Sequence, residues 1–436
     1  MKMLILVTKV TNRLQYIFDL LLEELLGIDV ELTTDSDAFV SYNGYKLHYG
    51  NAPLADEVFQ RSAHLLFERD VRTQELRPFD FGDVKAIFPI YHTDSLLPFD
   101  VFSASFFLVS RYEEYLPHVK DHYGRYMAND TFMYSVGMLQ KPLVNIWAMA
   151  LGDALQQKMP GLTLKKRSFK FVPTYDIDAA WAYKNKGLFR TLGGYAKNLL
   201  QGDFAEIRRR NRVLMGKTTD PFDTFELQFE LQKKYKLNPV YFVLCGNYDT
   251  HDKNISIRNT PFQNLIKRLG DYADVGIHPS FSSYLDDMKL KKEKESLENV
   301  LNSTVTKSRQ HFLKMNLPQS YQKLVEMDIT DDYTMGFASQ PGFRAGIADT
   351  FSFYDLDMDA DMHLRVHPFA LMDGTMRDYL DLDVEQSFEV ASQLIDEVKK
   401  VNGTFVLLWH NETLSDEKRW KGWLQLYRRI LDYAFS

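Results

Sequence analysis

The chain has 436 residues, of which 45% are hydrophobic and 25% are charged, and this composition is typical of a soluble globular protein with two domains. Its formal net charge of −7 argues against nucleic acid as a partner, because binding to phosphates requires a concentrated positive field. Cys245 is the only cysteine, which excludes an intrachain disulfide and a zinc–thiolate cluster.

The first apolar stretch covers only residues 3–7 and is soon followed by Lys9. Such a short stretch does not suffice for a signal peptide or for a helix that crosses a membrane. We therefore expect a cytoplasmic protein without a membrane partner.

Residues 1–165 mix short strand patterns with helical patterns and predict a small α+β domain. The expected strands are residues 3–7, 39–42, 46–49 and 86–89, and the expected helices are residues 11–26, 99–115 and 142–159. Pro160, Gly161 and the basic residues 165–167 then indicate a linker. We therefore divide the chain into an N-terminal domain, residues 1–165, and a second domain, residues 166–436.

In the second domain, strand patterns alternate with helix patterns. The expected strands are residues 169–175, 239–244, 273–277, 326–330, 363–370 and 404–409, and the expected helices are residues 223–235, 264–272, 285–315 and 384–401. This alternation predicts an α/β fold with a parallel sheet, open or closed into a barrel. Functional residues are expected at the carboxyl ends of its strands.

Two aspartates end the first expected strand of the second domain, in the order Asp176-Ile177-Asp178. Because side chains alternate along a strand, Asp176 and Asp178 point to the same side while Ile177 points into the packing. Two such carboxylates repel each other unless a cation, a shared proton or a neighbouring Arg or His offsets the charge. A solvated turn also explains an isolated Asp-x-Asp, so the interpretation depends on the residues that follow.

Three further residues could share the edge of the sheet where these aspartates lie. His278 and His410 each follow an expected strand, and Arg344 lies in a Gly-Phe-Arg-Ala-Gly turn. Taken alone, a histidine at a strand end is more often structural. Together, an Asp and a His can hold a divalent cation, a second Asp can take a proton from water, and a second His can protonate a leaving amine. An arginine would keep the basic Asp ionised, so the set predicts metal-assisted hydrolysis.

Four other residues could border the same site. Asp332 could support His410 or a ligand hydroxyl, although a solvated loop is the favoured explanation. His367 and Asp373 end another strand-like run, where turn chemistry alone accounts for Asp-Gly. Trp409 would suit a sugar ring or an acetyl pocket, with core packing as the alternative.

Arg208-Arg209-Arg210 and Arg212 form a basic cluster, which could in principle bind nucleic acid. Asp203 and Glu206 are close in sequence and the whole chain is acidic. We therefore expect a solvated helical surface rather than a nucleic-acid site.

Residues 166–436 resemble the polysaccharide deacetylases of carbohydrate esterase family 4, because their motifs follow one another along the chain in the family's order. These enzymes hydrolyse N- or O-acetyl groups of sugars on a distorted (β/α) barrel. The resemblance implies Asp176 as the general base, Asp178 and His278 as metal ligands, Arg344 as the residue that orients the base, and His410 in Leu408-Trp409-His410 as the general acid. Residues 1–165 are similar to the N-terminal extension of some bacterial members.

The chain departs from this family at two positions. The second metal-binding histidine of the family is expected four residues after His278, where this chain has Ser282. Ile177 separates two aspartates that are adjacent in many members. A serine hydroxyl is a poor zinc ligand, so Ser282 predicts either a weaker, oxygen-rich site or a loss of catalysis. The expected cofactor is a divalent ion, zinc first, with cobalt, nickel or manganese as alternatives.

The sequence thus predicts a metal-dependent deacetylase that acts on an acetylated saccharide. One alternative is a catalytically silent carbohydrate-binding homologue with an incomplete metal site, for which Ser282 is the main support. Another is an amide hydrolase that uses the same residues on a non-sugar substrate.

Overall fold

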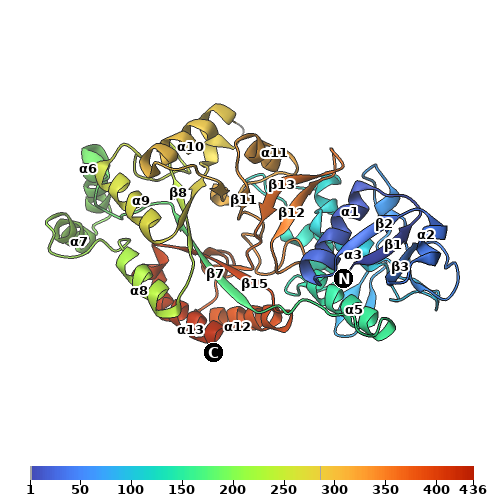
Figure 1. Ribbon diagram of the computed structural model, residues 1–436. Coiled ribbons are helices and arrows are strands. Elements are labelled where there is room, and N and C mark those ends of the chain that lie inside the picture. The colour runs from blue at the N-terminus through green and yellow to red at the C-terminus, as the bar shows by residue number, and fades with distance from the viewer. Residues whose placement is uncertain (1, 285) are drawn as a thin grey trace.

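The computed structural model describes residues 2–284 and 286–436, whose strands form three sheets (Figure 1). The first half contains a four-stranded parallel sheet in the order β2-β1-β3-β4 and an antiparallel pair, β5 and β6. The strands are β1 Met3–Val7, β2 Val30–Thr33, β3 Tyr45–Gly50, β4 Val58–Arg61, β5 Phe79–Phe81 and β6 Val84–Ala86.

Four helices of the first half begin at side-chain caps: α1 Asn12–Phe18, α2 Ser36–Ser41, α3 Val101–Val109 and α4 Phe132–Ser135. The first half also contains α5 Leu143–Lys158, and η1, Asp19–Leu25, continues α1 as a π-helix. Asp100 accepts the backbone N–H groups of Phe102 and Ser103 and so fixes the start of α3. The strand predicted at residues 39–42 is wrong, because Asp35 caps a helix there.

The second half contains a nine-stranded sheet in the order β12-β13-β11-β10-β9-β8-β7-β15-β14. Its strands are β7 Lys170–Ile177, β8 Val240–Leu244, β9 Asp274–His278, β10 Lys307–Ser308, β11 Asp331–Asp332, β12 Phe351–Asp355, β13 Ala360–Val366, β14 Leu371–Met372 and β15 Thr404–His410. Neighbouring strands are parallel except for β12 and β13. The α/β class is therefore confirmed.

Helices lie outside the strands of this sheet: in the view of Figure 1, α8, α12 and α13 lie below the strands, α10 and α11 lie above them, and α9 lies to their left. They are α6 Gly187–Leu200, α7 Phe204–Leu214, α8 Phe225–Tyr235, α9 Thr260–Tyr272, α10 Asp287–Leu301, α11 Gln319–Glu326, α12 Val384–Lys400 and α13 Trp423–Phe435. Among the residues described, β12 and β14 end the sheet without pairing to each other, so strand pairing does not close the expected barrel. No described helix combines the length and hydropathy needed to cross a membrane.

Two predicted elements of the second half are wrong. Leu285, the first residue of the helix expected over residues 285–315, lies outside the described residues, and α10 ends at Leu301 because Asn302 adopts a left-handed conformation with φ 53°. The following residues form β10, which pairs with both β9 and β11. The strand expected at residues 326–330 is also wrong, since α11 extends to Glu326 and β11 begins only at Asp331.

The two halves share a hydrophobic core. The ring of Tyr354, on β12, lies 4.9 Å from that of Tyr16 on α1 and 5.1 Å from that of Phe106 on α3. The predicted division at residue 165 falls in the connection between α5 and β7 and remains a prediction. Because of this shared core, the first half lies close enough to border a site on the second.

Candidate metal centre and active site

Four of the predicted site residues meet at one edge of the nine-stranded sheet. Asp176 of β7 is paired in register with His410 of β15, and His278 is the last residue of β9. Asp178 follows β7 directly. Because these strands run parallel, their carboxyl ends lie at the same edge and bring the four side chains together.

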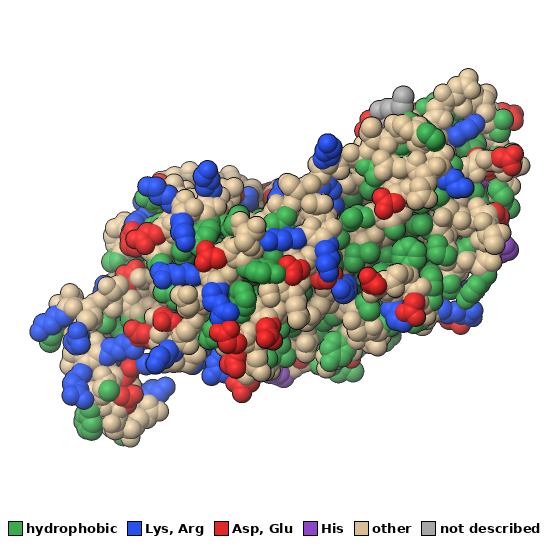
Figure 2. Space-filling view, turned by 90° about the horizontal axis from the view of Figure 1, so that it is seen from below, with side chains coloured by type: hydrophobic (Ala, Val, Ile, Leu, Met, Phe, Trp, Pro, Cys, Tyr) green, Lys and Arg blue, Asp and Glu red, His purple; other side chains and the backbone are tan. Residues whose placement is uncertain are grey.

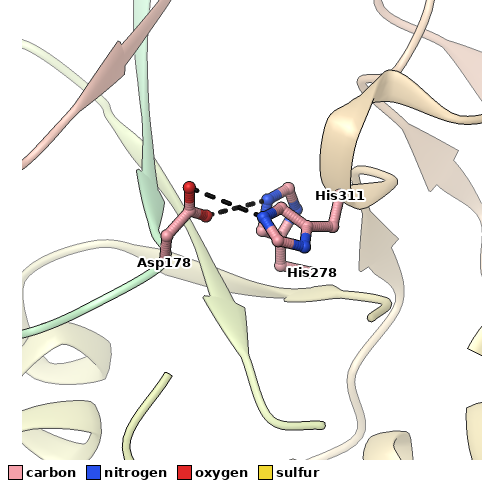
Figure 3. A group of neighbouring side chains, drawn as sticks. All are labelled: Asp178, His278 and His311. Carbon is pink, nitrogen blue, oxygen red and sulfur yellow. Dashed lines mark ion pairs between the residues drawn. The ribbon is translucent and has the colours of Figure 1, made fainter. Parts of the chain in front are cut away.

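Asp178, His278 and His311 form a three-residue cluster at this edge (Figure 3). One ligand atom from each residue lies within 4.8 Å of the others. Oδ1 of Asp178 is 3.3 Å from Nε2 of His278, and Oδ2 is 3.6 Å from Nε2 of His311. Both imidazoles are buried, whereas Asp178 is partly exposed. A single ion between these atoms could contact all three residues.

The hydrogen bonds around the cluster fit a divalent metal ion. Nδ1 of His278 lies 2.5 Å from the carbonyl oxygen of Arg309, and Nδ1 of His311 lies 2.8 Å from Oδ1 of Asp252. Because these oxygens accept hydrogen bonds, each Nδ1 carries the proton and each Nε2 is free to bind a metal. Oδ1 of Asp178 is buried without a hydrogen-bond partner, as expected of an atom prepared for a ligand. Two imidazoles and one carboxylate suit zinc.

The charges around the cluster favour a charged His–Asp network in the metal-free protein. Burial lowers the pKa of His311, but Asp178 and Asp252 outweigh it and raise the pKa to about 9. Loss of hydration raises the pKa of Asp178, but His311 and His278 outweigh this effect and hold it well below the usual range. Metal binding must therefore displace a proton from His311.

Asp176 is held by a buried arginine that the sequence analysis did not identify. Nη1 of Arg309 donates to Oδ1 of Asp176 at 2.9 Å and to Oγ1 of Thr174 at 2.7 Å, while Nε donates to the carbonyl oxygen of Tyr333 at 2.9 Å. Oδ2 of Asp176 lies 3.6 Å from Nε2 of His278. Arg309 thus fixes one oxygen of Asp176 and leaves the other directed toward the cluster.

His410 is held in a similar way by Asp373. Nδ1 of His410 lies 2.7 Å from Oδ1 of Asp373, whose Oδ2 accepts the backbone N–H of His410 at 2.8 Å. Burial lowers the pKa of His410, but Asp373 outweighs burial and raises the pKa well above its usual value. Asp332 instead accepts hydrogen bonds from Ser308 and Thr334. A protonated His410, with Nε2 3.9 Å from Asp178, can serve as an acid.

Ser282 lies outside the cluster. Its hydroxyl is 3.2 Å from that of Ser280, and its backbone N–H donates to Oδ2 of Asp252, the carboxylate that orients His311. Its side chain lines a separate cavity of about 690 Å³, whose lining includes none of the cluster residues. His311, rather than Ser282, is the residue that lies beside Asp178 and His278.

Arg344 lies at the junction between the two halves rather than at the cluster. Its Nη2 and Nε donate to the carboxylate of Glu114 at 2.6 and 2.9 Å, and Nη1 donates to the carbonyl oxygen of Gly336. Trp409, which the sequence offered as a surface for a sugar ring, is fully buried against Tyr427. Among the residues described, Arg309 is the arginine that contacts Asp176.

The sequence did contain a signal for the two missed residues, Arg309 and His311. Backbone hydrogen bonds join their N–H groups to the carbonyl oxygens of Ile277 and Pro279, so the extended chain continues past β10. Being two residues apart, they reach the same side of the sheet, as Asp176 and Asp178 do. The β-branched residues of Thr304-Val305-Thr306, just before β10, argued for a strand rather than the predicted helix.

A small cavity of about 190 Å³ opens over the cluster. Besides the residues above, its lining includes Phe312, Met372, Tyr379, Leu408 and Arg125. Arg125 belongs to the first half, and it donates to the carbonyl oxygen of Phe312 at 2.9 Å and to the Tyr379 hydroxyl at 3.1 Å. The first half therefore supplies part of the cavity wall.

Comparisons with known proteins match different parts of the chain. Residues 3–160 match a family of unknown function (DUF7033), and no curated protein matches. Over 61% of this chain, a structure described as a polysaccharide deacetylase from Mycobacterium smegmatis is similar at 15% identity, 85% coverage of its own chain and a TM-score of 0.40. The polysaccharide deacetylase Bc1974 from Bacillus cereus is similar over 61% of this chain and 86% of its own, at 12% identity and a TM-score of 0.29. PuuE allantoinase is similar over 62% of this chain and 84% of its own, at 10% identity and a TM-score of 0.39. Because these TM-scores are below 0.5, we base the function on the geometry of the site.

Proposed function

We propose that this protein is a metal-dependent hydrolase that removes acetyl groups from an N- or O-acetylated saccharide. One observation carries the proposal: the cluster of Asp178, His278 and His311 lies between two separately supported proton-transfer groups, Asp176 and His410. A structural ion site would need only the three ligands. A base and an acid at the same edge are the additional groups that hydrolysis requires.

The cluster would hold the ion through Nε2 of His278, Nε2 of His311 and the carboxylate of Asp178. With only three protein ligands in the cluster, a coordination position stays free for water or substrate, as in catalytic rather than structural zinc sites. When bound, the ion supplies a Lewis acid for the acetyl carbonyl group and for water. Zinc fits this donor set best, with cobalt, nickel and manganese as alternatives.

Asp176 is the general base of the proposed reaction. Arg309 occupies Oδ1, so Oδ2 is the atom that accepts a proton from the attacking water. The arginine thereby acts as a positioning residue, the role that the sequence analysis had assigned to Arg344. Holding the carboxylate in one orientation lowers the entropic cost of proton transfer.

His410 is the general acid. Its raised pKa keeps the imidazole protonated, and Asp373 orients the ring through Nδ1. Nε2 then carries the proton that passes to the leaving nitrogen or oxygen of the sugar. The base is thus held by an arginine and the acid by an aspartate.

The size of the cavity favours an acetyl group on a larger molecule. At about 190 Å³, the cavity over the cluster is smaller than the roughly 300 Å³ at which pockets begin to enclose a whole small ligand. An acetyl group fits inside while the rest of the substrate stays at the mouth. Tyr379, partly exposed at this mouth, offers an aromatic surface for a sugar ring.

Ser282 was the sequence feature that favoured a silent sugar-binding homologue. Since His311 supplies a second imidazole beside Asp178 and His278, Ser282 no longer argues for an incomplete site. The silent binder is kept as one outcome of the experiment below.

The proposal is tested by measuring zinc affinity and acetate release from acetylated oligosaccharides. His311→Ala should lower zinc affinity at least about 100-fold and reduce acetate release with it, because one of three ligands is lost. Ser282→Ala, the matched control, should change both by less than about twofold. His410→Ala should lower kcat by about 100-fold or more while zinc stays bound.

Two results would contradict the proposal. Wild-type affinity in His311→Ala would remove His311 from the metal site. A zinc-loaded, folded protein that binds acetylated sugars without releasing acetate would be the silent homologue.

A further inference from the structure

The helical pair α6 and α7, at the left edge of Figure 1, exposes an unusual amount of apolar surface. Large apolar side chains between 42% and 90% exposed recur along it: Leu188, Phe189, Leu192, Leu199, Leu200, Phe204, Leu214 and Met215. Single exposed apolar residues are common on protein surfaces, but a continuous group usually marks an interaction site. We call this pair with its connection, residues 187–215, the hairpin.

The apolar face of α6 points away from the protein. Leu188, Leu192 and Leu199 follow a helical spacing of four and seven residues and lie on one face, with Phe189 and Leu200 next to them. A helix that packs on a soluble core normally has the opposite orientation, with the apolar stripe inside.

The face of α6 that is turned inward is small and polar. Gly194 lies so close to Arg210 of α7 that a Cβ there would be 2.7 Å from the guanidinium. Asn198 on the same face is buried, and the hydroxyl of Tyr195 bonds to Asn211 of α7. The outward orientation of the leucines is therefore fixed by packing against α7.

The hairpin is also basic. Residues 187–215 contain six Lys or Arg and two Asp or Glu, a net charge of +4 in a chain whose total is −7. Lys197, Arg208 and Arg212 are exposed. Figure 2 shows Lys and Arg side chains beside hydrophobic ones on the lobe that protrudes at the lower left. The surface therefore combines exposed apolar groups with positive charge.

We propose that the hairpin binds reversibly to the surface of a bilayer that contains anionic phospholipids. Apolar side chains would enter the boundary between headgroups and acyl chains, while the basic residues contact the phosphates. This mode needs no helix that crosses the membrane. It revises our expectation that the protein has no membrane partner.

The charge and the exposed apolar side chains of the hairpin favour a lipid bilayer over a second copy of the chain or a nucleic acid. A second copy of the chain would bring two hairpins of the same net charge together, and like charges oppose that contact. A nucleic acid would satisfy the basic groups but would leave Phe189, Leu200 and their neighbours in water. An anionic lipid surface satisfies both.

The test is cosedimentation of the full-length protein with vesicles. Binding to vesicles of phosphatidylcholine mixed with phosphatidylglycerol should be at least about tenfold stronger than to phosphatidylcholine alone and should weaken with added salt. The double variant Phe189→Asp with Leu200→Asp should lower binding at least about tenfold, and so should Arg208→Glu with Arg212→Glu. Tyr91→Asp, at another highly exposed apolar side chain, is the control and should change binding by less than about twofold.

Several results would overturn the proposal. The folded wild-type protein could fail to bind anionic vesicles, or bind both vesicle types equally. A dimer that Phe189→Asp with Leu200→Asp dissociates, without vesicle binding, would identify a second copy as the occupant. Acetate release from soluble substrates is independent of this test, because no hairpin residue lines the cavity over the cluster.

Discussion

Two buried arginine–carboxylate pairs lie in different regions of this molecule: Arg309 with Asp176 at the edge of the sheet, and Arg344 with Glu114 at the junction of the halves. All four side chains are at most 3% exposed. The junction pair is bidentate, and Glu114 also accepts from Nε of Arg111 at 2.8 Å. The pair at the sheet edge has one hydrogen bond, and Nη2 of Arg309 has no partner.

The difference separates a structural pair from a functional one. A buried ion pair is tolerated when its remaining hydrogen-bonding groups are satisfied, as they are around Glu114. Buried polar atoms without a hydrogen-bond partner, such as Nη2 of Arg309 and Oδ1 of Asp178, are typical of a site that awaits a ligand when they lie near a cavity. Three predictions test this comparison.

Arg344→Met should have the largest effect on stability. It leaves the carboxylate of Glu114 buried with one guanidinium fewer, which should lower the free energy of unfolding by about 3–5 kcal/mol in urea denaturation. The control is Arg429→Met, which breaks an exposed pair with Glu385 and should cost less than about 1 kcal/mol. If folded Arg344→Met kept its stability but lost acetate release, Arg344 would be catalytic, as the family resemblance implies.

Acid should weaken the junction through Glu114. Burial raises its pKa, but Arg344 and Arg111 outweigh burial and lower the pKa from 4.5 to about 2. Because the folded pKa is below the unfolded one, the stabilisation is complete above about pH 4.5 and is lost as the pH falls toward 2. Relative to Glu114→Gln, the wild type should be about 3 kcal/mol more stable near neutral pH, and the difference should shrink in this range. A difference that does not vary with pH would contradict the assignment.

Of the three substitutions, Arg309→Lys should have the smallest effect on stability, and its main effect should be a lower kcat. Lysine keeps the positive charge but cannot hold Asp176, Thr174 and the Tyr333 carbonyl in one planar arrangement. We expect kcat to fall about 100-fold, with KM and zinc affinity within about threefold of the wild type. Arg344→Lys serves as its counterpart and should leave kcat nearly unchanged. A parallel loss of zinc affinity would instead indicate that Arg309 supports His278.

The central strands could be predicted from the sequence because each is a short apolar run with a clear end. β7, β8, β9 and β15 were expected within a few residues of their observed bounds. The short strands β10 and β11 were missed, because two residues are too few to show a periodicity. Pairing with β9 and with β13 decides the conformation of β10 and of β11, respectively, and such tertiary contacts are invisible in a local pattern.

The same limit explains the missed site residues. His311 was assigned to a long helix that the structure ends at Leu301, so it could not be considered as a strand-end ligand. Arg344 was assigned from the order of motifs along the chain, and such an order does not measure distance in the fold. Asp176, Asp178, His278 and His410 each follow a visible strand, and the structure brings these four together.

Arg125 lines the cavity over the cluster, although it belongs to the first half, which contains none of the proposed ligands and neither the base nor the acid. A mutation near this residue can reshape the entrance without altering any ligand, base or acid. Substitutions in the N-terminal region can therefore change the shape of the cavity entrance and, with it, the range of acetylated compounds that the proposed deacetylase accepts.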